Sequence, residues 1–195
     1  MTRILIILFV LTNCFSFSQK PNRTFADTTF KVGDLITTPQ VQFFICCRGC
    51  PDDGVAYETK DTLKLIAAFI QKHPKLIFQI DQHTDQRGDV AKNKKLSQDR
   101  ANSIRQYLVY KLSVDSTRVF VKGFGGSSPL YTSADIQKAK TKEEKENLYS
   151  QNRRTVLRVI GKTTGDKNSI DFNPTHCLEP TIKNSEKIKD KPVEK

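Results

Sequence analysis

Apolar residues follow two different spacings in successive segments of the chain. Over residues 61–73 they recur every three or four positions, which predicts an amphipathic helix that ends before Pro74. Residues 76–80 form a short apolar run in which Leu76, Phe78 and Ile80, two residues apart, lie on one side of a predicted strand. The change of period within so few residues indicates a helix that leads directly into a strand.

A longer helix and three further strands follow from the same patterns. Asp89 is a plausible N-cap for a helix that extends to about Lys111, with apolar residues at multiples of four. Short runs of β-forming residues predict strands at 41–45, 119–121 and 155–160.

The order strand, helix, strand, helix, strand, strand predicts an α/β sandwich. Its sheet is expected to be small, mixed and four-stranded, with the two main helices packed on one face. The other face should be polar or covered. Residues 127–150 form a polar excursion, in which Thr141 and Glu144 have the spacing of a capping box and predict one more short helix.

The first eighteen residues have the pattern of a signal peptide. Arg3 precedes a run of eight apolar residues that is too short to span a bilayer, and small residues follow, so cleavage is expected after Ser18. A lipoprotein signal that ends at Cys14 is the alternative, although Asn13 is a poor fit to the small residue expected before a lipidated cysteine.

Behind this segment we expect three regions. Residues 19–40 lack periodicity and form an extended leader, residues 41–160 form the globular domain, and residues 161–195 form a basic tail that is expected to be disordered.

Composition and charge narrow the choice of partner. The 195 residues include 32 Lys+Arg against 21 Asp+Glu, a formal charge of +11, and this mixture is unlike collagen, a coiled coil or a multi-span membrane protein. A basic excess suits nucleic acid, anionic lipid or another polyanion. Export argues against nucleic acid, and the lysines at 92, 94 and 95 have no interleaved aromatic residues, so no nucleic-acid partner is expected.

Four cysteines remain beyond the predicted cleavage point: Cys46, Cys47, Cys50 and Cys177. An even number in an exported chain predicts disulfides, with the pairing left open. Cys47 and Cys50 resemble half of a zinc site, but no second pair exists. We therefore expect no metal and no other cofactor.

One cation of the long predicted helix stands out. Arg100 lies within the apolar stripe, on the same side as Asn93. A guanidinium on that side needs a carboxylate partner or a cleft, and Asp85, in the loop before the helix, is the nearest candidate. The two charges either form a structural salt bridge or are held apart to receive a zwitterion.

The residues around this pair resemble the signature of OmpA-like domains, the type found at the C-terminus of OmpA and in peptidoglycan-associated lipoproteins. The resemblance covers roughly residues 40–160. The motifs that carry it, in order, are Asp81-Gln82-His83-Thr84-Asp85-Gln86-Arg87-Gly88, Asn93, Leu96-Ser97, Arg100-Ala101, Gly123-Phe124-Gly125 and Asn152-Arg153-Arg154.

The resemblance implies non-covalent binding of peptidoglycan through the diaminopimelate of its stem peptide. Asp85 would receive the ammonium and Arg100 the carboxylate of its free amino-acid end. Thr84, Asn93 and Leu96 would shape the pocket, and Arg153 would either support the loop or contact the ligand. The chain is then expected to be a cell-wall anchor in the periplasm at the outer membrane, with outer-membrane or envelope proteins as further partners.

The sequence departs from the family pattern at two places. Gln82 stands where many members have glycine, and Ile45-Cys46-Cys47 stands where many have Phe-Asp or Phe-Asn.

Three other functions compete with peptidoglycan binding. The first is an enzyme, suggested by His83 and Asp85, but no nucleophile or third ligand accompanies them, so we expect an exposed loop histidine and no catalysis. Nucleic-acid binding is the second competing function, and export disfavours it. The third is an exported protein-interaction module on the same fold that does not bind peptidoglycan.

Overall fold

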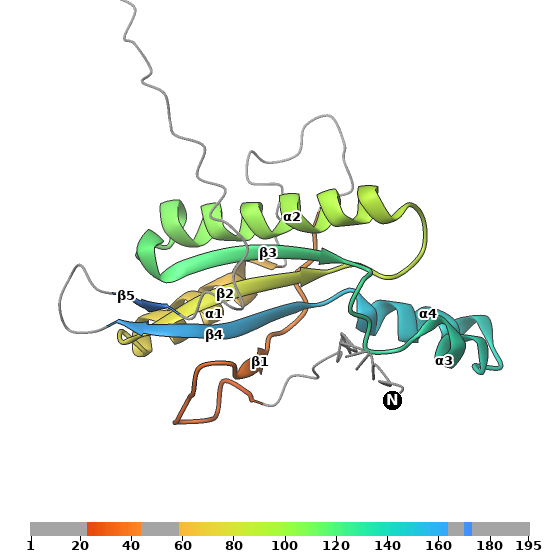
Figure 1. The fold of residues 1–195 in the computed structure, drawn as a ribbon, viewed down its shortest axis with the longest axis horizontal. Helices are drawn as coiled ribbons and strands as arrows, with labels where there is room; N and C mark the ends of the chain where they lie inside the picture. Colours follow the sequence, from red (N-terminus) through yellow and green to blue (C-terminus); the bar gives the residue numbers. More distant parts are fainter. Residues whose placement is uncertain (1–22, 44–58, 164–169, 173–195) are drawn as a thin grey trace, which may run out of the picture.

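The computed structural model describes residues 23–43, 59–163 and 170–172 (Figure 1). Helices and strands alternate along most of this part of the chain. In order they are β1 (Leu35–Thr37), α1 (Lys60–Lys72), β2 (Leu76–His83), α2 (Val90–Gln106), a π-helical turn (Tyr107–Lys111), a 3₁₀ turn (Ser116–Arg118), β3 (Val119–Gly125), α3 (Ser133–Gln137), α4 (Lys142–Asn152), β4 (Thr155–Thr163) and β5 (Ile170–Phe172).

The strands form one mixed sheet in the order β1-β4-β2-β3. The central strand β2 pairs parallel with β3 and antiparallel with β4, and β1 pairs antiparallel with β4. The fifth strand, β5, pairs with the end of β4. The predicted α/β fold with a mixed sheet four strands wide is therefore confirmed, with β5 as a short addition.

Both main helices pack on one face of the sheet, as predicted. The register places Phe78 opposite Val159 and Ile80 opposite Leu157, so these four side chains share a face. They belong to one core with the buried residues of α1 and with Ile104 of α2. The helical spacing of the apolar positions in α1 thus buries one stripe of that helix against the sheet.

The opposite face of β2 is polar, also as predicted. Asp81 is fully buried and pairs with Arg158 of β4 at 2.6 Å, and Gln79 donates a hydrogen bond to the same carboxylate at 2.6 Å. A buried charge is tolerated when it is paired and hydrogen-bonded in this way.

The folded region extends past both expected boundaries of the globular domain. β1 lies within the expected leader, and β4 and β5 continue beyond residue 160. Of the strand predicted at 41–45, residues 41 and 42 are not in a strand, residue 43 makes a single β-bridge, and the remainder lies outside the described residues. The edge strand forms earlier because Ile36, which is fully buried opposite Leu157, supplies the apolar contact to the core.

The long helix begins at the predicted N-cap, since the Asp89 side chain accepts a hydrogen bond from Lys92 N at 2.8 Å. Its buried face differs from the predicted stripe. Small residues, Ser97 and Ala101, are buried there, whereas Leu96 is 42% exposed. The helix packs so closely on β3 that a Cβ at Gly123 would overlap the backbone of Gln98, and this approach leaves no room for a leucine.

The excursion between β3 and β4 contains two helices, which Figure 1 shows together at one end of the sheet. α4 has the predicted capping box between Thr141 and Glu144. α3 was not predicted; it begins with a second capping box, between Thr132 and Asp135. None of the helices in the described part of the chain combines the length and the apolarity needed to cross a bilayer.

Candidate functional site

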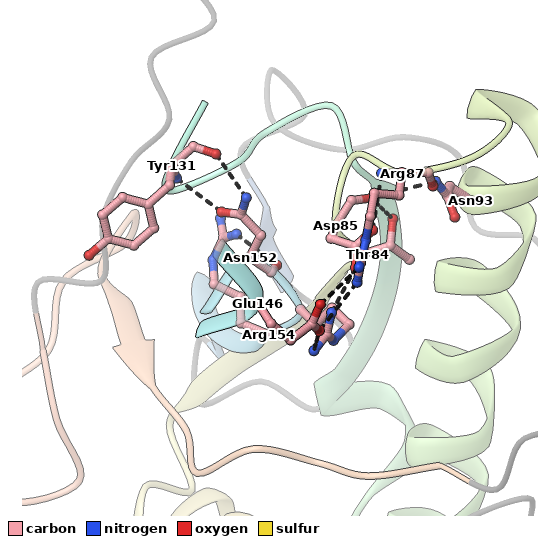
Figure 2. Close-up of polar contacts among 9 residues, drawn as sticks. Thr84, Asp85, Arg87, Asn93, Tyr131, Glu146, Asn152 and Arg154 are labelled. Atoms are coloured by element: carbon pink, nitrogen blue, oxygen red, sulfur yellow. Dashed lines mark hydrogen bonds and ion pairs between the residues drawn. The ribbon is translucent and has the colours of Figure 1, made fainter. Parts of the chain in front are cut away.

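The loop between β2 and α2 positions Asp85 through backbone contacts on both sides. Thr84 N donates to Gly125 O of β3 at 3.0 Å, and the Thr84 hydroxyl donates to the carbonyl of Asp85 at 3.0 Å. From α2, Asn93 Nδ2 donates to Arg87 O at 2.7 Å. Thr84 and Asn93, two predicted site residues, thus hold the loop against its neighbours (Figure 2).

Close packing of the following turn fixes the same loop. Gly88 adopts φ 85°, a conformation that favours glycine, and lets the chain turn into α2. A Cβ at Gly126 would lie 2.8 Å from the carbonyl oxygen of Asp85. Asp85 is therefore held by the end of β3 as well as by its own loop.

The Asp85 carboxylate is paired with two arginines, and neither is Arg100. Arg87 Nη2 and Arg153 Nη1 each lie 2.7 Å from Asp85 Oδ2, and Arg87 N donates to Oδ1 at 3.0 Å. Burial raises the pKa of Asp85, but the hydrogen bonds from Arg87 and Arg153 outweigh it and hold the pKa below its usual value. The structural salt bridge between Asp85 and Arg100, one of the two arrangements that the sequence allowed, is not formed.

α4 adds a second carboxylate and an aromatic ring to this cluster. Glu146 accepts from Arg87 Nη1 at 2.8 Å and from Arg153 Nη2 at 2.9 Å, and its pKa is lowered by these hydrogen bonds. The Arg87 guanidinium also lies 4.1 Å from the ring centre of Tyr149. Two arginines and two carboxylates therefore form one connected network between the loop and α4 (Figure 2).

Arg100 stands apart from the network. Its guanidinium lies 5.1 Å from the ring centre of Phe43, and among the described residues it has no ion pair or hydrogen bond. Burial lowers the pKa of Arg100, and the charge of Arg153 lowers it further, against the opposing effect of Asp85. The charges of Asp85 and Arg153 therefore act on the Arg100 guanidinium, whose N–H donors have no carboxylate partner in the described structure.

The charges of the site do not balance. Three guanidinium groups, those of Arg87, Arg100 and Arg153, face two carboxylates, those of Asp85 and Glu146. The excess positive charge falls on Arg100. Such a group offers a planar, two-pronged donor that fits the oxygen atoms of a carboxylate or a phosphate.

The remaining predicted site residues have distinct positions. Arg153 lies in the cluster, as the resemblance implied. Leu96 is exposed on α2, four residues before Arg100, where an apolar side chain is available to a ligand. Cys46, Cys47, Cys50 and Cys177 lie outside the described residues, as do residues 1–18, so the predicted disulfides and signal peptide remain predictions.

Sequence reasoning missed three members of the network: Arg87, Glu146 and Tyr149. A signal for them exists in retrospect. Glu146, Tyr149 and Arg153 recur at three and four residues and so share one side of α4 and its C-cap. Arg87 follows Asp85 by two residues, and only the fold brings it to Glu146.

His83 is not the exposed loop residue that we expected. β2 extends through it, its side chain is 4% exposed, and its ring stacks on Phe124 with 4.8 Å between ring centres. Burial lowers the pKa of His83 to about 2, and the nearby charge of Arg154 acts in the same direction. The described residues contain no group of three His, Cys, Asp or Glu side chains arranged to hold a metal ion.

The fold and the site can now be compared with known protein families. The protein has a mixed sheet with two helices on one face and a charged loop before α2. Residues 55–147 match the sequence model of the OmpA family. Over these residues, just under half of the chain, the sequence is similar to the OmpA family.

Individual relatives are similar over part of their length. The chain is 38% identical over 75 residues to outer membrane porin F of Pseudomonas aeruginosa, which covers 38% of this chain and 21% of that protein. It is 34% identical over 92 residues to the peptidoglycan-associated lipoprotein of Buchnera aphidicola, which covers 47% of each. The chain thus spans between a fifth and a half of the length of these curated relatives.

Solved structures show similar partial matches. The peptidoglycan-associated lipoprotein of Burkholderia pseudomallei has 22% identity and a TM-score of 0.45, with 62% of this chain and 89% of that chain covered. The cell wall anchor of the T6SS of Pseudomonas aeruginosa has 25% identity and a TM-score of 0.43, with 57% of this chain and 73% of that chain covered.

Proposed function

We propose that this chain is a non-catalytic cell-wall anchor that binds peptidoglycan in the periplasm at the outer membrane. The similarity to the OmpA family supports this proposal, as does the similarity to a protein named peptidoglycan-associated lipoprotein. The predicted signal peptide at residues 1–18 agrees with the location.

The proposed ligand is the free amino-acid end of diaminopimelate in the stem peptide. Its carboxylate pairs with Arg100, and its ammonium lies near Asp85. The observation that carries this assignment is the half-buried guanidinium of Arg100, which has no carboxylate partner among the described residues. Burying a charge without a partner costs free energy, so an incoming carboxylate satisfies the donors of Arg100 and gives its guanidinium an opposite charge.

The remaining residues of the site support this arrangement. We assign Thr84 and Asn93 to holding the loop that carries Asp85, because both make hydrogen bonds to its backbone. Arg153 fixes the Asp85 carboxylate. Leu96, exposed on the same side of α2 as Arg100, supplies an apolar wall for the methylene groups of the ligand.

A sedimentation assay with purified sacculi that contain diaminopimelate tests the proposal. The full chain is expected to sediment with the sacculi and to be released by free diaminopimelate. Arg100→Ala should abolish the part of this binding that free diaminopimelate releases, through the loss of charge-assisted hydrogen bonds worth about 1.5–3 kcal/mol each. Lys95→Ala is the matched control, because it removes an exposed positive charge from the same helix.

Stability measurements separate a lost ligand contact from a lost fold. Because Arg100 has no carboxylate partner in the described structure, Arg100→Ala should unfold in urea at the same concentration as the wild type or at a higher one. If the well-folded wild type does not bind sacculi, the proposal is wrong, and a protein-interaction role on the same fold becomes the one to pursue.

A further inference from the structure

We infer that Arg87 is a displaceable stand-in for the ligand's ammonium group, and that it sets the affinity and the selectivity of the site. The inference rests on the proposed function. In the unliganded protein the guanidinium of Arg87 occupies Asp85 Oδ2, the oxygen atom next to Arg153, at 2.7 Å. A ligand cation that pairs with the Asp85 carboxylate therefore meets a cation that is already there.

Exposure identifies which of the two arginines moves. The side chain of Asp85 is 12% exposed and that of Arg153 is 30% exposed, whereas the side chain of Arg87 is 50% exposed. Arg153 follows α4 directly and is its C-cap. Arg87 lies on the loop and reaches Asp85 from the solvent side, so it is the partner that a ligand displaces at lower cost.

A displaced Arg87 keeps two of its partners. Its Nη1 lies 2.8 Å from Glu146 Oε2, and its guanidinium is 4.1 Å from the ring centre of Tyr149. A small rotation away from Asp85 leaves both contacts in place. Its backbone N–H continues to donate to Asp85 Oδ1, so the loop retains its shape while the side chain moves.

This arrangement favours ligands that carry both charges. An ammonium group alone takes the place of Arg87 at Asp85, but Arg87 stays in the site on Glu146, so the excess positive charge of the site rises by one. A ligand that also carries a carboxylate supplies a partner for Arg100, and its two charges together add no net charge to the site. The selectivity for an amino-acid end over a simple amine therefore comes from competition with Arg87 together with the donors of Arg100.

Binding of two soluble probes to wild type and Arg87→Gln tests the inference. Diaminopimelate carries ammonium and carboxylate groups, and pimelate is the same chain without the ammonium groups. Arg87→Gln should bind diaminopimelate about threefold to tenfold more tightly than the wild type, because the competing cation is gone. Its affinity for pimelate should be unchanged or lower. Lys95→Gln removes an exposed, ion-paired cation from α2 and should bind diaminopimelate and pimelate with the affinities of the wild type.

Glu146→Gln provides the opposite test. Without Glu146, Arg87 loses its second carboxylate partner and remains on Asp85, so diaminopimelate should bind several-fold more weakly. In the Arg87→Gln background the same substitution should have a smaller effect, because the two residues act through one contact.

The outcomes distinguish the two proposals. If neither wild type nor Arg87→Gln binds diaminopimelate or sacculi, the proposed function fails. If the wild type binds and Arg87→Gln binds equally well or more weakly, the function stands and the stand-in role of Arg87 is wrong. The stand-in role is also wrong if Arg87→Gln binds pimelate more tightly than the wild type by the same factor as diaminopimelate. Such a result would indicate a change of loop structure, which affects both probes.

Discussion

Single side chains in this domain differ most in how their charge is compensated. Asp81 is fully buried and fully paired, Asp85 is paired with two arginines, and Arg100 has no carboxylate partner among the described residues. His83 is buried in its neutral form, so it needs no partner of opposite charge. Compensation therefore varies with position: Asp81 in the sheet and Asp85 in the loop have ion pairs, whereas Arg100 on α2 has none among the described residues.

The buried neutral state of His83 makes stability depend on pH. In the folded protein the pKa of His83 is about 2, against an ordinary value of 6.5. Below pH 6.5 His83 is protonated in the unfolded chain but stays neutral in the folded protein. The free energy of unfolding therefore falls as the pH falls, by about 1.4 kcal/mol per pH unit. Between pH 7 and pH 4.5 this amounts to about 3 kcal/mol.

Urea unfolding at several pH values checks this expectation. His83→Gln, which does not titrate, should lose less stability than the wild type over the same interval. His73→Gln is a useful comparison, because burial also lowers the pKa of His73 but the residue is less buried, so its contribution is smaller and of the same sign. Equal pH dependence of wild type and His83→Gln would contradict a buried neutral ring.

Reasoning from single residues predicted a charged site at Asp85 and Arg100, but it did not predict the ion pairs that the structure shows. Asp85 and Arg100 were recognised from their spacing and motif, yet the partners of Asp85 are Arg87, two residues away, and Arg153, 68 residues away. Helical periodicity also placed Leu96 in the apolar stripe. The close approach of β3 overrides that pattern, because only small residues fit beneath the helix.

At the level of elements, the packing of α2 on β3 depends on glycine. Gly123 N donates to Gln98 Oε1 at 2.8 Å, and Gly125 N donates to Ser97 Oγ at 2.8 Å. The strand thus lies close enough for its backbone to bond directly to helix side chains. This contact fixes the end of α2 that carries Asn93 and Arg100.

Gly123→Ala should therefore destabilise the domain substantially. The added Cβ would overlap the backbone of Gln98 and the side chain of Ser97, and backbone cannot yield as a flexible side chain does. Overpacking of this kind costs about 1–3 kcal/mol, and thermal or urea unfolding measures it. Gly33→Ala is the comparison, because no atom lies within 4 Å of the Cβ there, although its φ of 97° introduces backbone strain. Similar unfolding midpoints for Gly123→Ala and wild type would show that α2 shifts without cost.

The elements that the sequence predicted are the long or strongly patterned ones. α1, β2 and α2 span several periods each, so their patterns are clear. β1 and β5 have three residues each and α3 has five, too few to show a period. β1 and β5 form because they pair with β4, which is tertiary information, whereas α3 begins with a local capping box between Thr132 and Asp135.

For the whole molecule, the net charge of +11 adds long-range attraction to the specific contacts of the site. A cell wall rich in carboxylates should therefore attract the chain even without Arg100, at low ionic strength. At 0.1 M salt such forces are screened beyond about 10 Å, whereas contacts in a half-buried site are screened much less.

Sedimentation with sacculi at two salt concentrations separates the two contributions. Residual binding of Arg100→Ala at low salt should disappear at about 0.5 M NaCl, where the screening length is only a few ångströms. The wild type should retain binding that free diaminopimelate competes away. Binding of the wild type that is lost entirely at high salt would show that charge alone accounts for it.

The position of β1 has a mechanical consequence. A protein fixed to the wall bears load between its ligand site and its chain ends, and a pull on the residues before Arg23 reaches the sheet through the bridge between Arg23 and Ile36 and then through β1. β1 is three residues long and lies at the edge of the sheet, so it should detach first, pair by pair. Every element that builds the site follows β1 in the chain. Under the proposed function, the domain therefore has a short segment that yields under tension before the contacts of the site with peptidoglycan are disturbed.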